Sequence, residues 1–210
     1  MPEKLWYEFE DDGETRDNAE DWRQHSCCFT GHRILSAEER AAIDENLRPL
    51  LRDLIENEGI SCFLAGGALG FDTIAALTVL ELKEDFPHIR LKLILPCADQ
   101  DSKWRPSQRK LYRDIIARAD AVEYIAAAYL PGCMQARNRA LVEQSSVCVC
   151  ALRHQAQNSG TEFTVSLAEA QGRTLYNVLD KKRTPVPRNE GFILYRCLIA
   201  VKTAGSPCLL

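Results

Sequence analysis

Three glycines lie close together in the segment AGGALGFD, at Gly66, Gly67 and Gly70, between an apolar run and a helical pattern. At such a turn, missing side chains let backbone N–H groups approach a phosphate, and the helix N-terminus adds a favourable dipole. The loop lacks the Lys-Ser/Thr ending of a Walker A motif and the regular spacing of a dinucleotide fingerprint. The pattern is therefore typical of phosphate binding or of a tight turn alone. Asp72 is expected to be the N-cap of the next helix, or otherwise a ribose-binding or catalytic carboxylate.

A second candidate phosphate cradle is the segment Ser159, Gly160 and Thr161, which offers hydroxyls and backbone amides at another predicted helix start. Thr164 lies one helical turn further on and is expected on the same side. Plain N-capping by Ser159 or Thr161 explains the same residues equally well.

Cationic and amide side chains lie between these loops. His32 and Arg33 follow the first predicted strand, and Arg137 and Asn138 belong to the segment MQARNR. An arginine can pair with a phosphate through two parallel hydrogen bonds, and an amide can contact a base or ribose edge. The alternative for Arg137 and Asn138 is a solvated helix face.

Trp104 and Gln100 follow the third predicted strand. An indole at this position can stack on a base, although a single tryptophan more often packs against the protein. Gln100 is a weaker candidate for the same site.

These residues are placed by an alternation of short apolar runs with helical patterns, which is typical of parallel βαβ units. Strands are expected at 27–29, 60–65, 91–96, 121–125, 146–152 and 174–179, and helices at 36–59, 73–86, 106–118, 134–145 and 161–171. The sequence therefore predicts an α/β fold, a three-layer Rossmann-like domain with a mostly parallel sheet of five or six strands flanked by helices. Ligands of such sheets bind at the carboxyl ends of the strands, where the candidate loops lie.

Composition limits the function. The 210 residues are 46% hydrophobic and carry a net charge of −4, which makes a dedicated duplex-DNA binder unlikely. No apolar run is long enough to span a membrane and no signal-peptide pattern is present, so a soluble, cytoplasmic protein is expected. The nine cysteines form no CxxC pair and the four histidines are scattered. We therefore expect reduced core thiols and no metal site.

Charge divides the chain into three parts. Residues 1–25 form an acidic arm with three basic and nine acidic residues (3 − 9 = −6), and residues 181–210 form a basic extension with six basic residues and one acidic residue (6 − 1 = +5). The Rossmann-like domain is expected over 26–180. The apolar run at 192–201 can dock on the core or on a second copy of the chain, so a homodimer is possible.

The order and spacing of FTGHR, AGGALGFD, a proline-ended strand with Gln and KW downstream, MxxRN and SGTxxT resemble one family. That family is the YpsA-like branch of the SLOG superfamily, which is related to the Smf/DprA proteins and to the LOG nucleotide phosphoribohydrolases. The resemblance covers about residues 26–178. It implies a Rossmann-like fold that binds a nucleotide or nucleotide-derived ligand, such as an ADP-ribose-like compound, and no certain cofactor.

The resemblance also assigns residues. It implies ligand-binding roles for the first-strand loop, the glycine loop, one helix and the SGT segment, at Thr30, Gly31, His32, Arg33, Gly66, Gly67, Gly70, Asp72, Met134, Arg137, Asn138, Gly160 and Thr161. The chain departs from the LOG pattern at Thr164, which stands where those enzymes have their catalytic glutamate. Glu162 is present, but one residue along a helix points elsewhere, about 100° around the axis.

Three functions follow from this set. The favoured one is a sensor or regulator that binds a nucleotide-type ligand. The second is an enzyme, a hydrolase of nucleotide N-glycosidic bonds, with Asp72 or Glu162 as the carboxylate that such a cleavage requires. The third, by analogy with Smf/DprA, is single-stranded nucleic-acid binding, for which a basic groove and stacked aromatic residues are expected.

Overall fold

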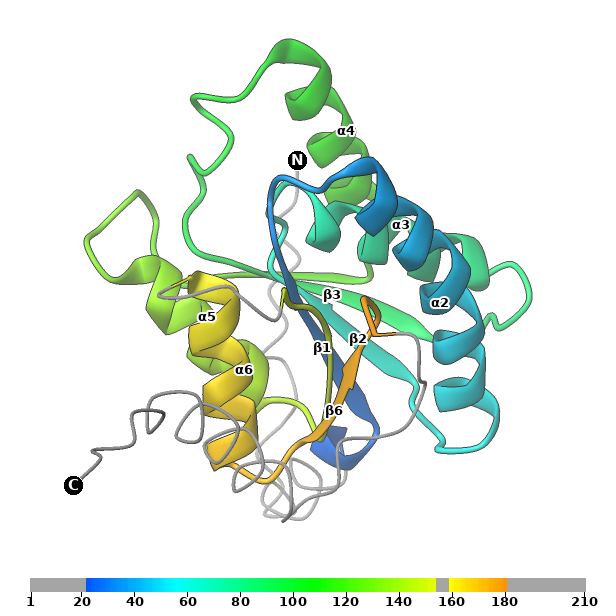
Figure 1. Ribbon diagram of the computed structural model, residues 1–210. Helices are drawn as coiled ribbons and strands as arrows, with labels where there is room; N and C mark the ends of the chain where they lie inside the picture. Colours follow the sequence, from blue (N-terminus) through cyan, green and yellow to red (C-terminus); the bar gives the residue numbers. More distant parts are fainter. Residues whose placement is uncertain (1–21, 154–158, 181–210) are drawn as a thin grey trace, which may run out of the picture.

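The computed structural model describes residues 22–153 and 159–180 (Figure 1). The described ranges leave out residues 1–21, which are most of the acidic arm, and residues 181–210, which are the basic extension with the apolar run at 192–201. The predictions made for these segments therefore lie outside the described residues. The strands are β1 (Ser26–Gly31), β2 (Cys62–Ala65), β3 (Arg90–Leu95), β4 (Ala121–Tyr124), β5 (Val147–Ala151) and β6 (Thr174–Asn177). The helices are α2 (Ala37–Glu56), α3 (Phe71–Leu82), α4 (Pro106–Arg118), α5 (Cys133–Glu143) and α6 (Gly160–Ala170).

The six strands form one sheet in the order β4-β3-β2-β1-β5-β6, and every neighbouring pair is parallel. The chain first builds outward from β1 to β4 and then crosses back to add β5 on the other side of β1. The order therefore reverses between β1 and β5, and the crevice at their carboxyl ends is where open α/β sheets bind ligands.

Helices cover both faces of the sheet, which gives the predicted three layers. Buried side chains of α2, α3 and α4 join one apolar cluster, and those of α5 and α6 join the other. Figure 1 shows the same division, with α5 and α6 together on one side of the strands. The predicted Rossmann-like α/β fold is confirmed.

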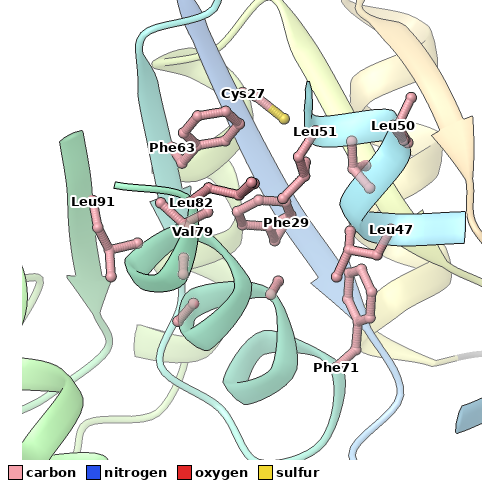
Figure 2. Close-up of a cluster of buried hydrophobic side chains, with 14 of the residues drawn as sticks. Cys27, Phe29, Leu47, Leu50, Leu51, Phe63, Phe71, Val79, Leu82 and Leu91 are labelled. Carbon is pink, nitrogen blue, oxygen red and sulfur yellow. The ribbon is translucent and has the colours of Figure 1, made fainter. Parts of the chain in front are cut away.

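Three aromatic residues lie in the apolar cluster that α2 and α3 share with the sheet. Phe29 of β1 lies parallel to Phe63 of β2 with ring centroids 6.0 Å apart, and meets the edge of Phe71 at 6.3 Å (Figure 2). Each of the three rings is fully buried. Burial of this size stabilises the fold by a few kcal/mol per ring, and it fixes the start of α3 against the end of β1.

The start of α2 agrees with the sequence prediction, and the start of α3 does not. At α2, where the sequence predicts a helix from residue 36, Ser36 is the N-cap and forms a capping box with Glu39. At α3, the helix begins at Phe71 and its N-cap is Gly70, so the expectation that Asp72 caps this helix is wrong. The cause is the chain reversal at Gly70, whose φ of 83° lets the Phe71 N–H donate to the carbonyl of His32.

The described parts of the chain contain no helix long and apolar enough to cross a membrane. Their cysteines are all free and buried, at Cys27, Cys28, Cys62, Cys97, Cys133, Cys148 and Cys150. Within residues 22–153 and 159–180, no group of three or more His, Cys, Asp or Glu side chains can hold a metal ion.

Candidate functional site

A cavity of about 260 Å³ lies at the carboxyl end of β1, between the N-terminal turns of α5 and α6. Most of the predicted ligand-binding residues line it: Thr30, Gly31, His32, Arg33, Asp72, Arg137, Asn138, Ser159, Gly160 and Thr161. Met134 and the apolar side chains of Phe29 and Leu141 complete much of the wall. The structure thus brings together residues from four segments that are far apart in the sequence: the end of β1, the start of α3, α5 and the start of α6.

The other predicted residues are not among the described residues that line this cavity. They are Gly66, Gly67, Gly70, Gln100, Trp104, Glu162 and Thr164. Most of them pack directly behind the lining residues, and their contacts explain what they do.

Arg137 is the central side chain of the site. It is 6% exposed, so the solvated-helix alternative is wrong for it. Its guanidinium reaches from α5 to the glycine loop, where Nη1 donates a hydrogen bond to the carbonyl of Gly66 and lies 3.7 Å from a carboxylate oxygen of Asp72. Arg137 therefore joins α5 to the glycine loop and to α3.

Asp72 lies in the first turn of α3 with its side chain 6% exposed. One carboxylate oxygen accepts the N–H of Ala68 at 3.4 Å. Burial raises the pKa of Asp72, although the positive charge of Arg137 opposes that change. Burial also lowers the pKa of Arg137, so each group depends on the other for its charged form.

The glycines of the AGGALGFD loop make room for the protein's own atoms. A Cβ on Gly66 would collide with the guanidinium of Arg137, and a Cβ on Gly70 would collide with the backbone carbonyls of His32 and Arg33. These two glycines permit the close approach of three loops. Their contacts are with the chain itself, in keeping with the turn interpretation of the loop.

Gln100 and Trp104 support the same loop from the α4 side of the sheet. The side-chain amide of Gln100 donates to the carbonyl of Gly67 at 2.7 Å. Trp104 packs edge-on against Tyr112, with ring centroids 5.1 Å apart. Trp104 thus follows the packing alternative.

The N-terminus of α6 opens into the cavity. Ser159 is its N-cap, and the hydroxyl accepts the N–H of Glu162 at 3.0 Å. The N–H groups of Gly160 and Thr161 donate to no described residue, as is usual for a first helical turn. Thr164 is fully buried and its hydroxyl donates back to the carbonyl of Gly160 at 2.8 Å, so it stabilises the turn.

Asn138 connects the two helices at the cavity. Its side-chain oxygen accepts from Nε of Arg137 at 2.8 Å, and its amide nitrogen lies 3.4 Å from the carbonyl of Gly160. The amide thus orients Arg137 and sets the distance between α5 and α6.

Arg33 is exposed at the cavity and forms no ion pair with any residue in the described parts of the chain. Arg33 and Arg137 each bring one positive charge to the cavity lining, and Asp72 brings one negative charge. Positive charge is therefore in excess. An anion is the ligand that such a charge balance favours.

Sequence reasoning missed the pair of Arg153 and Glu39. Nε and Nη2 of Arg153 donate to the two carboxylate oxygens of Glu39 at 2.5 and 2.8 Å. The ion pair holds the pKa of Glu39 down at about 2. The position of Arg153 immediately after a buried strand is the signal that was available in the sequence.

Known proteins resemble parts of this chain. A UPF0398 protein of Halalkalibacterium halodurans is 42% identical over 94 residues, which cover 44% of this chain and 49% of the relative. A UPF0398 protein of Brevibacillus brevis is 35% identical over 80 residues, which cover 37% and 43%. The chain thus spans less than half the length of either relative. A UPF0398 protein of Bacillus pumilus is 29% identical over 154 residues, 71% of this chain and 82% of the relative.

Among solved structures, the DNA processing protein A of Helicobacter pylori has a similar fold. The TM-score is 0.54 at 20% sequence identity, over 89% of this chain and 83% of the other. At this identity the likeness concerns the fold. Residues 29–180 match the model of the YspA SLOG family (YpsA), which is most of the chain, and this protein belongs to that family.

Proposed function

We propose that the cavity binds a nucleotide or nucleotide-derived ligand and that the protein acts as a sensor or regulator of that ligand. The observation that carries the proposal is the coincidence, in one cavity, of the α6 N-terminus and of Arg33, which forms no ion pair with any described residue. The cavity lies at the reversal point of the strand order, where α/β sheets of this kind bind ligands.

The phosphate is expected at the N-terminus of α6. The N–H groups of Gly160 and Thr161, which donate to no residue in the described parts of the chain, lie in the first turn of the helix, and the helix dipole adds to their attraction for an anion. Arg33 supplies a full positive charge from the opposite loop. The glycine loop supports this arrangement from behind by holding Arg137 in place.

The size of the cavity favours one nucleotide unit. Small-molecule sites commonly measure about 300–1,000 Å³, and the 260 Å³ enclosed by the described residues lies just below that range. The apolar wall of Phe29, Leu141 and Met134 suits the less polar part of such a ligand. A dinucleotide would extend beyond this volume.

A thermal-shift panel of AMP, ADP, ATP, NAD and ADP-ribose tests the proposal. A ligand at 100 times its Kd stabilises the folded state by about 2.7 kcal/mol, and about 5–10 °C is expected for a chain of this size. Arg33→Gln should weaken the shift. Arg40→Gln is the matched control, because it removes the same charge from an exposed position on α2 outside the cavity lining. The absence of a shift with every nucleotide would contradict the proposal, as would equal losses in the two variants.

An enzyme on the same site is the second candidate, and Asp72 is the observation in its favour. A buried carboxyl with a raised pKa that lines a cavity can donate a proton to a leaving base. Thr164, which stands at the position of the LOG glutamate, offers no carboxylate, and this favours sensing over cleavage. Product analysis of the bound nucleotide separates the two: turnover that Asp72→Asn abolishes while binding persists would establish the enzyme.

Single-stranded nucleic-acid binding is the third candidate. The DNA processing protein A of Helicobacter pylori binds single-stranded DNA. In this chain, residues 101–118 carry six basic and two acidic side chains (6 − 2 = +4), against −4 for the whole sequence. Fluorescence anisotropy of a labelled single strand at several salt concentrations tests this candidate, since phosphate contacts make affinity fall steeply with salt.

A further inference from the structure

One nitrogen of the His32 ring accepts a hydrogen bond from the protein backbone. Its Nε2 accepts the backbone N–H of Arg153 at 3.3 Å. A nitrogen that accepts a hydrogen bond carries no proton, so the neutral ring must carry its proton on Nδ1. Burial lowers the pKa of His32, and the charge of Arg153 lowers it further, so both favour the neutral ring.

The N–H that fixes this tautomer is itself held in place. The Arg153 side chain binds both oxygens of Glu39, and its Nη2 also donates to the carbonyl of Ile34 at 2.7 Å. On the other side, the Asn177 side chain accepts the N–H of Leu152 at 3.1 Å and donates to its carbonyl at 2.9 Å. The backbone at 152–153 is thus braced by β6 on one side and by the start of α2 on the other.

The second ring nitrogen is available to a ligand. Nδ1 of His32 has no hydrogen-bond partner among the described residues, and His32 lines the cavity. The backbone carbonyl of His32 accepts the Phe71 N–H at 3.2 Å and the ring accepts the Arg153 N–H, so the residue is held at both ends. It lines the same cavity as Arg33 and the first residues of α6.

We propose that His32 is a specificity-determining residue whose Nδ1–H donates to an oxygen acceptor of the ligand, and that Arg153 is the positioning residue that fixes this tautomer. The proposal deepens the proposed function and rests on it. The acceptor is an oxygen of the phosphate or hydroxyl type, because the ring in this state offers one donor and no free acceptor. A ligand with an N–H donor at the same place would be rejected.

Two amide substitutions of His32 distinguish the roles of its two ring nitrogens. Asparagine places a side-chain N–H close to the position of Nδ1, whereas glutamine places it close to Nε2. His32→Asn should keep nucleotide affinity within about threefold, and His32→Gln should lose about tenfold, as expected for one hydrogen bond. Equal losses in the two variants, or no loss in either, would overturn the proposal.

The tautomer is measured on the free protein, so this arm does not depend on nucleotide binding. Two-bond ¹H–¹⁵N correlation spectra distinguish Nδ1–H from Nε2–H, and the His32 signals are identified by their absence in His32→Asn. The wild type should show Nδ1–H, and Arg153→Ala should show both forms, since its backbone N–H loses its anchor. A wild-type ring protonated on Nε2 would overturn the inference even if nucleotides bind, whereas failure of all nucleotides to bind an Nδ1–H protein would overturn the proposed function.

Discussion

The two sides of the sheet's carboxyl edge differ in how they use their polar residues. On the α4 side, the glycine loop is closed by the protein: Gln100 binds the carbonyl of Gly67, and Trp104 packs on Tyr112 behind it. On the α5–α6 side, the N-terminus of α6 and Arg33 border a cavity. The three glycines of the AGGALGFD motif therefore support the site from behind, and the cavity is lined mainly by the less conspicuous segments around them.

The charged residues at this edge of the sheet are also of two kinds, buried and paired or exposed. Arg137 and Asp72 line the cavity, but they are buried and paired, and they also hold the glycine loop in place. Arg33 is exposed and unpaired with any described residue, and it belongs to the open side. Substitutions on the support should change stability, and substitutions on the open side should change binding.

The largest effect is expected for Arg137→Met, which leaves the Asp72 carboxylate and the Gly66 carbonyl buried without their partner. Breaking a buried pair in this way costs about 3–5 kcal/mol of unfolding free energy. Arg139→Met is the control on the same helix, since Arg139 is exposed and only lies over the ring of Phe163. Urea denaturation measures both. Adding Asp72→Asn to Arg137→Met should recover part of the lost unfolding free energy. Equal losses for Arg137→Met and Arg139→Met would show that the contacts of Arg137 with Asp72 and Gly66 do not stabilise the fold.

A smaller effect is expected for Gly70→Ala. The new methyl group meets two carbonyl groups at a φ of 83°, so strain and overpacking together cost about 3 kcal/mol. Gly172→Ala is the matched control: its φ is 67°, but nothing lies within 4 Å of the added Cβ, and about 1 kcal/mol is expected. Thermal unfolding of the two variants compares them. If the Gly70→Ala protein were as stable as the Gly172→Ala protein, the loop would accommodate a Cβ at residue 70 without overpacking, contrary to the prediction.

The smallest effect, about 1 kcal/mol, is expected for Glu39→Gln, because the partner Arg153 is partly exposed. The carboxyl has its pKa lowered to about 2 in the folded state, against about 4.3 when unfolded. Its contribution is therefore present above pH 4.3 and is lost as the pH falls towards 2. The difference in Tm between wild type and Glu39→Gln should shrink over this window. A difference that stays constant with pH would contradict the ion pair.

Much of the fold could be predicted from the sequence, because apolar runs such as SVCVCAL are buried on both faces of a parallel sheet and alternate with helical patterns. The gathering of the candidate residues at one edge of the sheet was also predictable, because loops after parallel strands share that edge. Which of them line the cavity was not predictable. That outcome depends on Arg137 reaching Gly66, which is 71 residues away in the chain, and on Gln100 and Trp104 filling the other side.

Local geometry decided two further points. The start of α3 moved to Phe71 because Gly70 reverses the chain against His32, a contact between loops that helix patterns do not contain. The tautomer of His32 depends on Arg153, which follows β5 and is a neighbour of β1 only in the folded sheet.

Backbone amide NMR during titration with the nucleotide that gives the largest thermal shift tests the central claim most directly. We expect the amide signals of Gly31, His32, Arg33, Gly160 and Thr161 to move first and furthest, while the side-chain signals of Gln100 and Trp104 stay in place. The reverse pattern, with the largest changes at Trp104 and Gln100, would place the ligand on the α4 side and contradict the division between a supporting and a binding side.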